Sequence, residues 1–543
     1  MKSSYILIIV FIFSLELFSQ TDIPTDFLSK DFHAKRREIL RGKMPNNSIA
    51  VIFSNPIRNR SNDVDYVFHQ DPNFYYLTGY REPNGVLLLF SNDQIDKDGT
   101  IYNEILFVQE RDVVAEMWSG KRIGVNGVKN QLGFKKAENA IDFINSKIDF
   151  TRFFKVFIDG KFKDDYRNTS NSAEIYDLVN SFKEKSGYNP ESYISETKKY
   201  LYTIISTKPI EDKPKVVEII KSYDSAYPEV SSDLLIQNYM KANSEILIKD
   251  NQKKVAFALL PTTNIDVSFI TRQLAEMREI KTVGELNLLK KAVRISAIGQ
   301  IEVMKAVKPH MSETEIQGIH EFIYKKYGVE YEGYPSIVGG GNNGCVLHYI
   351  ENNKTHVGHD LVLMDLGAEY RGYTADVTRT IPADGTFSKE QKFIYDLVYK
   401  SQEAGIKASI MGADFNEPTK VARKIINRGL YDLGIIKSPD SRHQYFPHGA
   451  SHYIGLDVHD PGTYGKLREN SVITVEPGIY IPKGSDCDEK WWGIAVRIED
   501  DILITKEGPV NLSKEAPRKS EEIEKMMKKS SFFGSFLLPN IDE

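Results

Sequence analysis

The stretch MDLGAEYRGYTADVTRT, Met364 to Thr380, decides the predicted fold of the second half of this chain. It contains two aspartates, Asp365 and Asp376, eleven positions apart. Apolar and β-prone residues surround both, and turn-forming residues lie near Glu369–Gly372, so the pattern predicts a β-hairpin with both acids in the sheet. Two buried carboxylates on neighbouring strands repel each other, and a metal ion would compensate them. The alternative is that one of the two aspartates faces solvent and the other lies in the turn.

Length and composition restrict the classes of protein to which this chain can belong. The chain has 543 residues, which predicts two or more domains. Its formal net charge of −5 gives no indication of a nucleic-acid or anionic-membrane partner. The two cysteines, Cys345 and Cys487, exclude a disulfide scaffold and a cysteine-rich zinc site.

The first twenty residues predict an export signal. Lys2 supplies a positive charge, and Tyr5–Leu15 is an apolar core about half as long as a bilayer-spanning helix. We expect cleavage near Ser19 or Gln20, with an uncleaved anchor as the alternative. No other long apolar run follows, so we expect a periplasmic or secreted protein without a stable membrane span.

Residues 21–275 are predicted to form one α/β domain. Neither histidines nor cysteines gather with acids there, so no catalytic set is expected. Strands are expected at Asn47–Phe53, at two places within Phe74–Phe90, and at Glu104–Val108, Phe154–Asp159 and Val255–Leu260; amphipathic helices are expected at Asn171–Lys185 and Ser231–Lys241.

Residues 276–510 are predicted to form a second domain, with the boundary near Glu276–Lys281. It opens with a helix over Glu279–Val307, because Thr282 and Glu285 have the spacing of a capping box. A second helix is expected at Glu313–Tyr327. A tail, 511–543, follows with a predicted helix at Ser520–Lys529, either on the surface or in contact with another subunit.

Four further stretches contain residues suited to chemistry. His348 lies in the strand-like run NNGCVLHYIEN, and HGASHYIGLDVHD contains His448, His452 and His459. Glu476 precedes Pro-Gly in TVEPGIY, and Arg497 and Glu499 share one face of a strand in IAVRIEDDI. Taken alone, these residues also have purely structural interpretations. His348 could be a core histidine, Glu476 a solvated strand end, and Arg497 with Glu499 an internal salt bridge.

Together these stretches predict a set of metal ligands: Asp365, Asp376, His452, Glu476 and Glu499. This oxygen-rich set suits Mn²⁺ and tolerates Co²⁺ or Zn²⁺. Two divalent ions would neutralise the four carboxylates, so a dinuclear site could lie in a dry pocket. Two ions about 3.5 Å apart can share a hydroxide that is ionised near neutral pH, which gives a hydrolase nucleophile.

The order of these motifs resembles the pita-bread metallopeptidases, most of all aminopeptidase P (Xaa-Pro aminopeptidase) and next prolidase. The similarity covers about Glu276–Thr505, and DPNFYYLTGYREPNGVLLL and ERDVVAEMWSGKRIG resemble the N-terminal domain of that family. The resemblance implies an α/β (α+β) fold with a pita-bread catalytic domain after an aminopeptidase P-like domain. All five ligand positions carry the family's residue type, whereas creatinase relatives lack these ligands.

The resemblance also implies roles for the metal ligands. Asp365 would be a terminal ligand of one ion, and Asp376 and Glu499 would bridge the two ions. His452 and Glu476 would complete the other ion.

Further roles are implied around the ligands. Glu476 would also act as general base or proton shuttle, and His459 and His348 would hydrogen-bond the scissile carbonyl or the tetrahedral intermediate. His448 would position the substrate, and Arg497 would orient the bridging Glu499.

The implied reaction is release of the residue ahead of proline by attack of a bridging hydroxide. An Xaa-Pro bond has no N–H, and such a nucleophile needs only a polarised carbonyl. Expected partners are peptides with proline at the second position and a second copy of the chain, as a homodimer or homotetramer. The alternatives are a prolidase and, from another class, a non-catalytic peptide-binding module.

Overall fold

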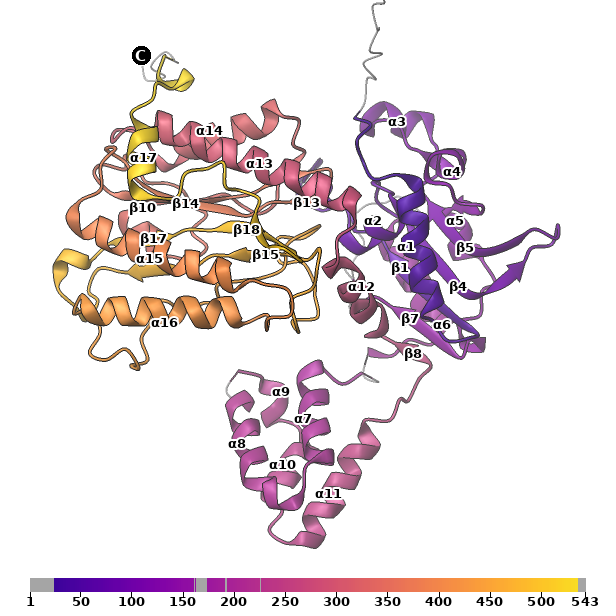
Figure 1. Cartoon of the computed structure of the whole chain (residues 1–543). Coiled ribbons are helices and arrows are strands. Elements are labelled where there is room, and N and C mark those ends of the chain that lie inside the picture. Colours follow the sequence, from indigo (N-terminus) through magenta and orange to yellow (C-terminus); the bar gives the residue numbers. More distant parts are fainter. Residues whose placement is uncertain (1–23, 161, 163–172, 191–192, 225, 536–543) are drawn as a thin grey trace, which may run out of the picture.

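The computed structural model describes residues 24–160, 162, 173–190, 193–224 and 226–535. Figure 1 shows an N-terminal α/β domain, a projecting group of helices and a larger C-terminal domain. The predicted export signal lies outside the described residues. Within them, no helix combines the length and apolar character that crossing a membrane requires.

The N-terminal domain is built on one six-stranded sheet. Its order is β6-β5-β4-β1-β7-β8, and β1 runs antiparallel to β4 and parallel to β7. The predicted strands at 47–53, 104–108 and 154–159 are confirmed. The bounds are β1 (Ser48–Phe53), β4 (Val86–Ile95), β5 (Ile101–Val108), β6 (Ala137–Asn139), β7 (Lys155–Ile158) and β8 (Ile265–Asp266).

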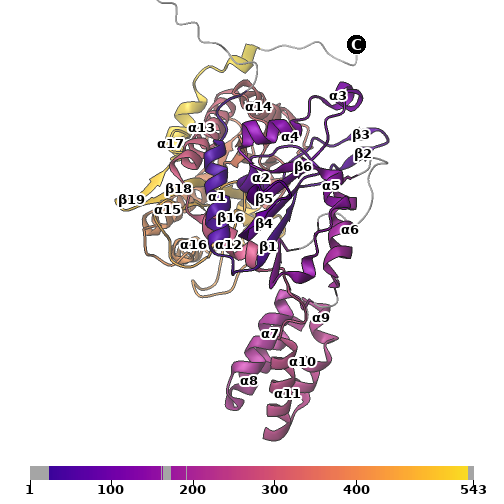
Figure 2. The same ribbon diagram turned by 90° about the vertical axis from the view of Figure 1, so that its right-hand side faces the viewer.

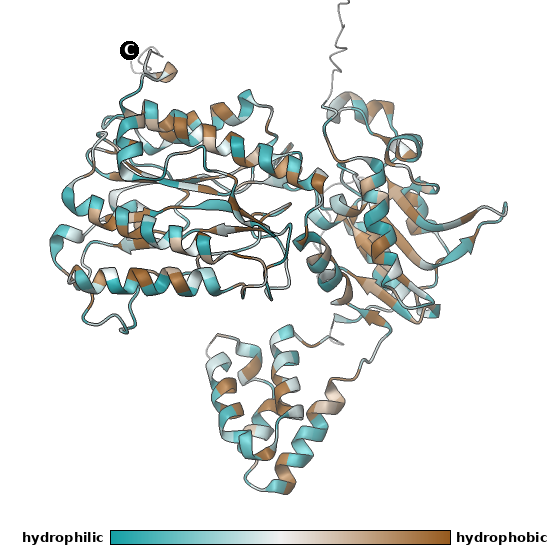
Figure 3. Ribbon diagram, viewed as in Figure 1, coloured by the Kyte–Doolittle hydropathy of each residue, from teal (hydrophilic) through white to brown (hydrophobic). Residues whose placement is uncertain are grey.

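Helices cover both faces of this sheet because its strands alternate apolar side chains to either side. One face packs against α1 (Lys30–Gly42), α2 (Pro72–Thr78) and α12 (Phe269–Glu279), and the other against α5 (Ala140–Asn145) and α6 (Ile175–Ser186). Figure 3 shows apolar residues concentrated along these strands.

The first strand predicted within Phe74–Phe90 is wrong, since α2 occupies that place. The side chain of Asp71 accepts a hydrogen bond from the backbone N–H of Phe74, Pro72 is the first helical residue, and Gly79 ends the helix with a φ of 71°. These signals at the two helix ends outweigh the β-preference of the aromatic run. The aromatic side chains are buried, as expected.

A helical module interrupts the N-terminal domain between α6 and β8. The prediction of one α/β domain over residues 21–275 did not distinguish this module. It projects away from the sheet (Figures 1 and 2) and has its own core, which includes Leu201, Ile220 and Tyr239. The predicted strand Val255–Leu260 is wrong, because its first four residues end a capped helix. The module comprises α7 (Glu196–Thr207), α8 (Lys213–Asp224), α9 (Pro228–Ser231), α10 (Leu234–Lys241) and α11 (Glu245–Ala258).

The C-terminal domain places short sheets between two layers of helices. Figure 1 shows α13 (Val283–Ala306) and α14 (Glu313–Lys326) on one side, with α15 (Lys389–Ala408) and α16 (Glu417–Asp432) on the other. The predicted capping box at the start of α13 is confirmed, since Thr282 and Glu285 each accept from the other's backbone N–H.

The described part of the tail, residues 511–535, packs against the C-terminal domain. The predicted helix is α17 (Ser520–Met527), and its Ile523 and Met527 are buried in the same core as residues of α13. The guanidinium of Arg379 donates to the backbone carbonyls of Ala516 and Pro517, which fixes the chain leading into α17. The predicted surface helix is confirmed: Glu521, Glu522 and Lys525 are exposed, and the opposite, apolar face packs on the core.

Candidate active site

The Met364–Thr380 stretch forms a hairpin that changes sheets halfway. Its turn is Arg371–Gly372, both at positive φ, which confirms the predicted position. The change occurs at Gly367, where a Cβ atom would lie 1.8 Å from a backbone carbonyl oxygen, so only glycine fits. Its strands are β11 (Leu361–Leu366), β12 (Ala368–Tyr370), β13 (Tyr373–Thr374) and β14 (Val377–Pro382).

The two aspartates hold different positions in this hairpin. Asp365 lies in β11, opposite Thr378 of β14. Asp376 lies in the break between β13 and β14, not within a strand as predicted. Because the chain leaves the regular strand ladder at Asp376, the carboxylate of Asp376 turns toward that of Asp365.

A second hairpin repeats this arrangement for the two glutamates. Glu476 lies between β15 and β16, and Glu499 lies between β17 and β18. Because β15 pairs with β18 and β16 with β17, both glutamates lie where the chain passes from one ladder to the next. The strands are β15 (Val472–Val475), β16 (Gly478–Ile481), β17 (Ile494–Arg497) and β18 (Asp500–Thr505).

His452 brings its imidazole to the carboxylates of both hairpins. Its Nε2 lies 3.4 Å from Asp376 Oδ2, 3.7 Å from Glu476 Oε1 and 4.0 Å from Glu499 Oε1. Its Nδ1 lies 3.1 Å from the carbonyl oxygen of Tyr453, so Nδ1–H donates there and the Nε2 lone pair faces the acids. Asp376, His452 and Glu499 hold possible ligand atoms within 4.8 Å of one another.

Tyr334 links the two aspartates and was missed in the sequence. Its hydroxyl oxygen lies 2.6 Å from Asp365 Oδ1 and 2.6 Å from Asp376 Oδ1. A hydroxyl has one hydrogen, so it donates to one carboxylate at a time. The segment YEGYPS contains two tyrosines, Tyr331 and Tyr334, and their spacing does not indicate a metal site.

Of the four carboxylates of the cluster, Asp365 alone forms an ion pair with an arginine or lysine among the described residues. Burial and then the charge of Asp365 raise the pKa of Asp376 well above its usual range, and burial and then Asp376 do the same for Glu499. Burial raises the pKa of Glu476 to about 7. Burying four carboxylates close together costs free energy when they are ionised. Two divalent cations would offset this cost, because they would neutralise the carboxylates and coordinate their oxygens. The residues therefore fit the predicted metal centre.

Arg497 pairs with a different ligand from the predicted one. Its Nη2 lies 2.6 Å from Asp365 Oδ2, and it reaches Glu499 only through Thr378: the Thr378 hydroxyl accepts from Arg497 Nε at 3.4 Å and donates to Glu499 Oε2 at 2.6 Å. Burial alone would raise the pKa of Asp365, but Arg497 and hydrogen bonds lower it overall.

A hydrogen-bonded chain runs from Arg497 to His448, which lies close to Glu476. Arg497 Nη1 donates to the Tyr480 hydroxyl at 2.9 Å, which leaves that hydroxyl to donate to His448 Nε2 at 2.8 Å. His448 Nδ1 donates to the carbonyl of Gly449 and lies 3.6 Å from Glu476 Oε2. Burial and then Arg497 lower the pKa of His448 to about 4, so its imidazole is neutral at pH 7.

The two remaining histidines lie toward solvent. The His459 ring is perpendicular to that of His452, with centroids 4.4 Å apart, and His459 lines a cleft together with Tyr334 and Leu456. Burial and then His452 and His348 lower the pKa of His459. His348 is exposed and follows a short 3-10 turn, Gly341–Cys345, rather than lying in a strand as predicted.

The interdomain linker supports the loop that carries His459. Arg278 at the end of α12 donates to Asp457 at 2.6 Å and also to Asp460, and Lys281 Nζ lies 3.0 Å from Asp460. Arg278, Lys281 and Asp460 are all buried. This ion-pair network fixes the residues on both sides of His459.

Comparisons with known proteins agree with this geometry. The family model described as "Aminopeptidase P, N-terminal domain" matches residues 33–149, and "Metallopeptidase family M24" matches residues 287–506. The Xaa-Pro aminopeptidase of Escherichia coli is 31% identical over 512 residues, covering 92% of this chain and 98% of that protein. The Xaa-Pro aminopeptidase of Haemophilus influenzae is 32% identical over 518 residues, with the same coverage.

Solved structures give the same result. E. coli aminopeptidase P with the inhibitor Pro-Leu superposes with a TM-score of 0.70 at 30% identity, covering 92% of this chain and 98% of that one. Pseudomonas aeruginosa aminopeptidase PepP has a TM-score of 0.70 at 28% identity, covering 93% and 99%. The chain therefore belongs to the aminopeptidase P family and is a metallopeptidase.

Proposed function

We propose that this chain is an Xaa-Pro aminopeptidase, which releases the N-terminal residue ahead of proline. The observation that carries the proposal is the convergence of Asp365, Asp376, His452, Glu476 and Glu499 on one buried cluster, from four separate stretches of sequence. Relatives that align along nearly their whole length have the same named activity.

The five residues would hold two divalent ions. Asp365 would bind one ion, His452 and Glu476 the other, and Asp376 and Glu499 would be shared. When bound, such ions polarise a carbonyl and lower the pKa of water. We propose Mn²⁺, because four of the five side chains offer carboxylate oxygens.

The chain's own residues would position the substrate and move the protons. Glu476 would take a proton from the attacking water and return it to the leaving proline nitrogen. His459 and His348, on the solvent side, donate to the scissile carbonyl and to the oxyanion that forms from it. His448 is neutral and hydrogen-bonded, which suits substrate positioning rather than proton transfer.

The chemistry matches the substrate. An Xaa-Pro bond offers no N–H to recognise, so the peptide is held through its carbonyl and its free amine. Carboxylate oxygens of the metal centre would accept hydrogen bonds from that free amine, which restricts cleavage to the first residue of the peptide.

Hydrolysis assays test this proposal. The full-length protein, treated with a chelator and reloaded with Mn²⁺, is incubated with Xaa-Pro, Xaa-Pro-Yaa-Zaa and the control Xaa-Ala-Yaa-Zaa, and products are separated by HPLC. We expect release of Xaa from the proline tetrapeptide only after metal is restored. Cleavage of the dipeptide alone would indicate a prolidase, and no cleavage with bound metal would support the peptide-binding module.

We also propose assembly into a homodimer or homotetramer. It is supported by α3 (Val113–Ser119), a surface helix with no buried residue, whose Met117 and Trp118 side chains are 81% and 89% exposed. Light scattering after size-exclusion chromatography should show a smaller particle for Trp118→Ser than for the unaltered protein.

Export remains a proposal that rests on Lys2 and the apolar run Tyr5–Leu15. N-terminal sequencing of protein from the periplasm or the medium should find the chain starting near residue 20. A chain that keeps Met1 in the cytosolic fraction would contradict it.

A further inference from the structure

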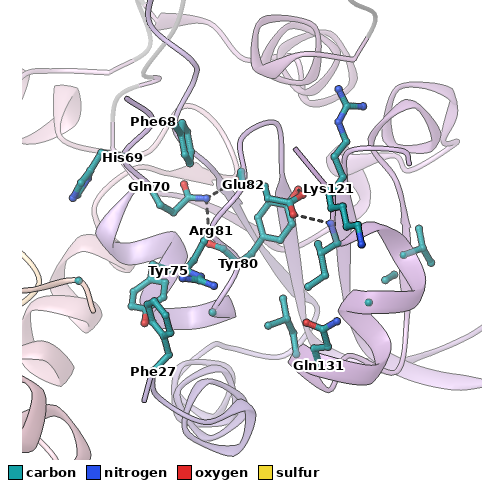
Figure 4. A pocket seen from close by; sticks show the side chains of 18 of the residues that line it. Phe27, Phe68, His69, Gln70, Tyr75, Tyr80, Arg81, Glu82, Lys121 and Gln131 are labelled. Carbon is teal, nitrogen blue, oxygen red and sulfur yellow. Dashed lines mark hydrogen bonds between the residues drawn. The ribbon is translucent and has the colours of Figure 1, made fainter. Parts of the chain in front are cut away.

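The 341–353 segment carries His348 and forms part of the cleft that His459 lines. Ile350 of this segment lines the cleft, as does His69 of the N-terminal domain. His69 also lines a neighbouring cavity of about 1300 Å³, which is formed mainly by the N-terminal domain (Figure 4). The catalytic domain thus supplies the 341–353 part of the cleft wall, and the conformation of this segment decides where the His348 imidazole lies.

One buried carboxylate joins the two ends of the 341–353 segment. Glu313 is the first residue of α14 and is completely buried. Its Oε1 accepts from the backbone N–H of Gly340 at 2.7 Å and from the side-chain amide of Asn343 at 3.1 Å. Its Oε2 accepts from the backbone N–H of Lys354 and from the Tyr349 hydroxyl, both at 2.8 Å. Because Gly340 and Lys354 flank the segment, Glu313 holds it at both ends and near its middle.

Uncharged groups hold the Glu313 carboxylate. The four donors that the described residues supply are two backbone N–H groups, an amide and a hydroxyl. The ammonium group of Lys354 pairs with Asp360 instead. An ionised carboxylate offers about four acceptor positions and no donor, which no neutral side chain of this size can match. The conformation of the 341–353 segment therefore depends on a glutamate at position 313.

The glycine-rich stretch at the start of the segment permits a tight path beside Glu313. A Cβ atom at Gly339 would lie 2.7 Å from the backbone nitrogen of Gly344, and Gly341 has a φ of 61°. Side chains larger than hydrogen would push the chain out of this path. The glycines thus serve the same arrangement as the carboxylate.

On its other side, the 341–353 segment contacts the proposed metal centre. The carbonyl oxygen of Leu347 lies 3.5 Å from Nη2 of Arg497, the guanidinium nitrogen that also pairs with a proposed metal ligand. The next residue but one, Tyr349, is the one that donates to Glu313. His348 lies between these two residues, so its backbone is held from the metal centre and from α14.

We propose that Glu313 is a positioning residue, which fixes the 341–353 segment so that the His348 imidazole reaches the scissile carbonyl. This inference rests on the proposed function, in which His348 donates to that carbonyl and to the oxyanion formed from it. Glu313 acts through the segment, since a completely buried side chain does not contact the substrate. A hydrogen bond to the oxyanion is stronger in the transition state than in the bound substrate. Misplacing His348 should therefore lower kcat and leave KM nearly unchanged.

Double-mutant kinetics test this role. Glu313→Gln keeps the size of the side chain but replaces one oxygen by an amide group, which cannot accept from the donors that face it. We expect kcat for Xaa-Pro-Yaa-Zaa to fall about 10–100-fold when the substitution is made alone. In a His348→Ala background it should fall less than about twofold, because the imidazole is already missing. An equal fall in both backgrounds, or an unchanged kcat in Glu313→Gln, would overturn the proposal.

Two further variants separate positioning from general stability. Asp233 in the helical module is also a buried carboxylate at a helix start that accepts from a tyrosine hydroxyl and backbone N–H groups. Asp233→Asn should therefore lower the melting temperature and keep kcat; a matching loss of kcat would assign the effect of Glu313→Gln to stability. Tyr349→Phe removes only the hydroxyl that donates to Glu313. If Glu313→Gln does not fold, an unchanged kcat in Tyr349→Phe would overturn the proposal.

Amide hydrogen exchange tests the same role without turnover. In the metal-free full-length protein, residues 341–353 should exchange about tenfold faster in Glu313→Gln than in the unaltered protein. Unchanged exchange there would overturn the proposal. If exchange differs but the unaltered protein cleaves no Xaa-Pro peptide, the proposed function fails and the role of Glu313 in holding this segment stands.

Discussion

Gln300 and Gln402 make matching contacts on the two halves of the catalytic domain. Gln300 on α13 donates to the carbonyl of Met364 at 3.1 Å and to that of Val377 at 2.7 Å, the residues just before Asp365 and just after Asp376. Gln402 on α15 donates to the carbonyl of Val475, just before Glu476, and to the side chain of Asp500, just after Glu499. Each glutamine thus joins the two strands that carry one carboxylate pair.

Replacing Gln300 by Leu should weaken metal binding without unfolding the protein. Two buried carbonyls lose their donor, at about 1–3 kcal/mol each, and the spacing of Asp365 and Asp376 is no longer fixed. We expect affinity for Mn²⁺ to fall about 10–100-fold, measured by calorimetry. Asn251→Leu, a buried amide replaced in the helical module, is the control and should lower stability alone. Unchanged metal affinity in Gln300→Leu would leave this glutamine a purely structural role.

Replacing Glu499 by Gln should abolish hydrolysis and yet stabilise the metal-free protein. The pKa of Glu499 is raised in the folded state, so its ionisation costs stability as pH rises above its ordinary value of 4.5. A neutral side chain of the same size removes that cost. We expect the melting temperature without metal to rise by roughly 2–4 °C at pH 8 and to change less at pH 5.

In the presence of metal, Glu499→Gln should have a lower melting temperature than the unaltered protein, because the substitution removes a proposed ligand. Added Mn²⁺ should raise the melting temperature of the unaltered protein far more than that of the variant. Retained turnover in this variant or in Asp376→Ala would contradict the assignment of these residues as ligands.

Arg497→Lys should be strongly harmful although charge is conserved. A lysine cannot contact Asp365, Tyr480 and Thr378 simultaneously, as the guanidinium does. We expect kcat/KM to fall about 10–100-fold. Arg294→Lys, at an exposed pair with Glu515, is the matched control and should keep full activity. Equal activity of both variants would show that only the charge of Arg497 matters.

The sequence predicted those parts of the fold that depend on interactions between residues close together in the chain. The helix over α13 follows from apolar periodicity and the capping box, and the hairpin turn from its glycine. The strand assigned to Phe74 failed because aromatic residues suit both strands and buried helices, although Asp71, Pro72 and Gly79 mark the ends of a helix. The helical module has no composition that distinguishes it from other amphipathic helices.

The five proposed ligands were predicted from residue type and motif, but their arrangement depends on tertiary structure. No pattern within IAVRIEDD shows that Arg497 pairs with Asp365, which lies 132 positions away in sequence. Tyr334 and the two glutamines are likewise defined only by what they face. The sequence therefore predicted the proposed ligands and gave no sign of Tyr334, Gln300 and Gln402, which contact these ligands or the residues next to them.

The contact between His69 and Glu369 should make stability depend on pH. His69 Nε2 lies 2.9 Å from Glu369 Oε2 and joins the N-terminal domain to β12. The hydrogen bond to Glu369 raises the pKa of His69 above its ordinary 6.5. A raised folded-state pKa gives stability that is fully present below pH 6.5 and is lost as pH rises through the folded-state value.

Thermal unfolding of the unaltered protein and of His69→Gln tests this dependence. We expect the variant to melt at a lower temperature at pH 5.5, and the gap to shrink by pH 9, where His69 is neutral in both folded and unfolded chains. His359→Gln, which removes a more exposed histidine–aspartate pair, should show a small gap at both pH values. A gap for His69→Gln that stays constant with pH would mean that the histidine contributes through packing on Tyr331 rather than through its charge.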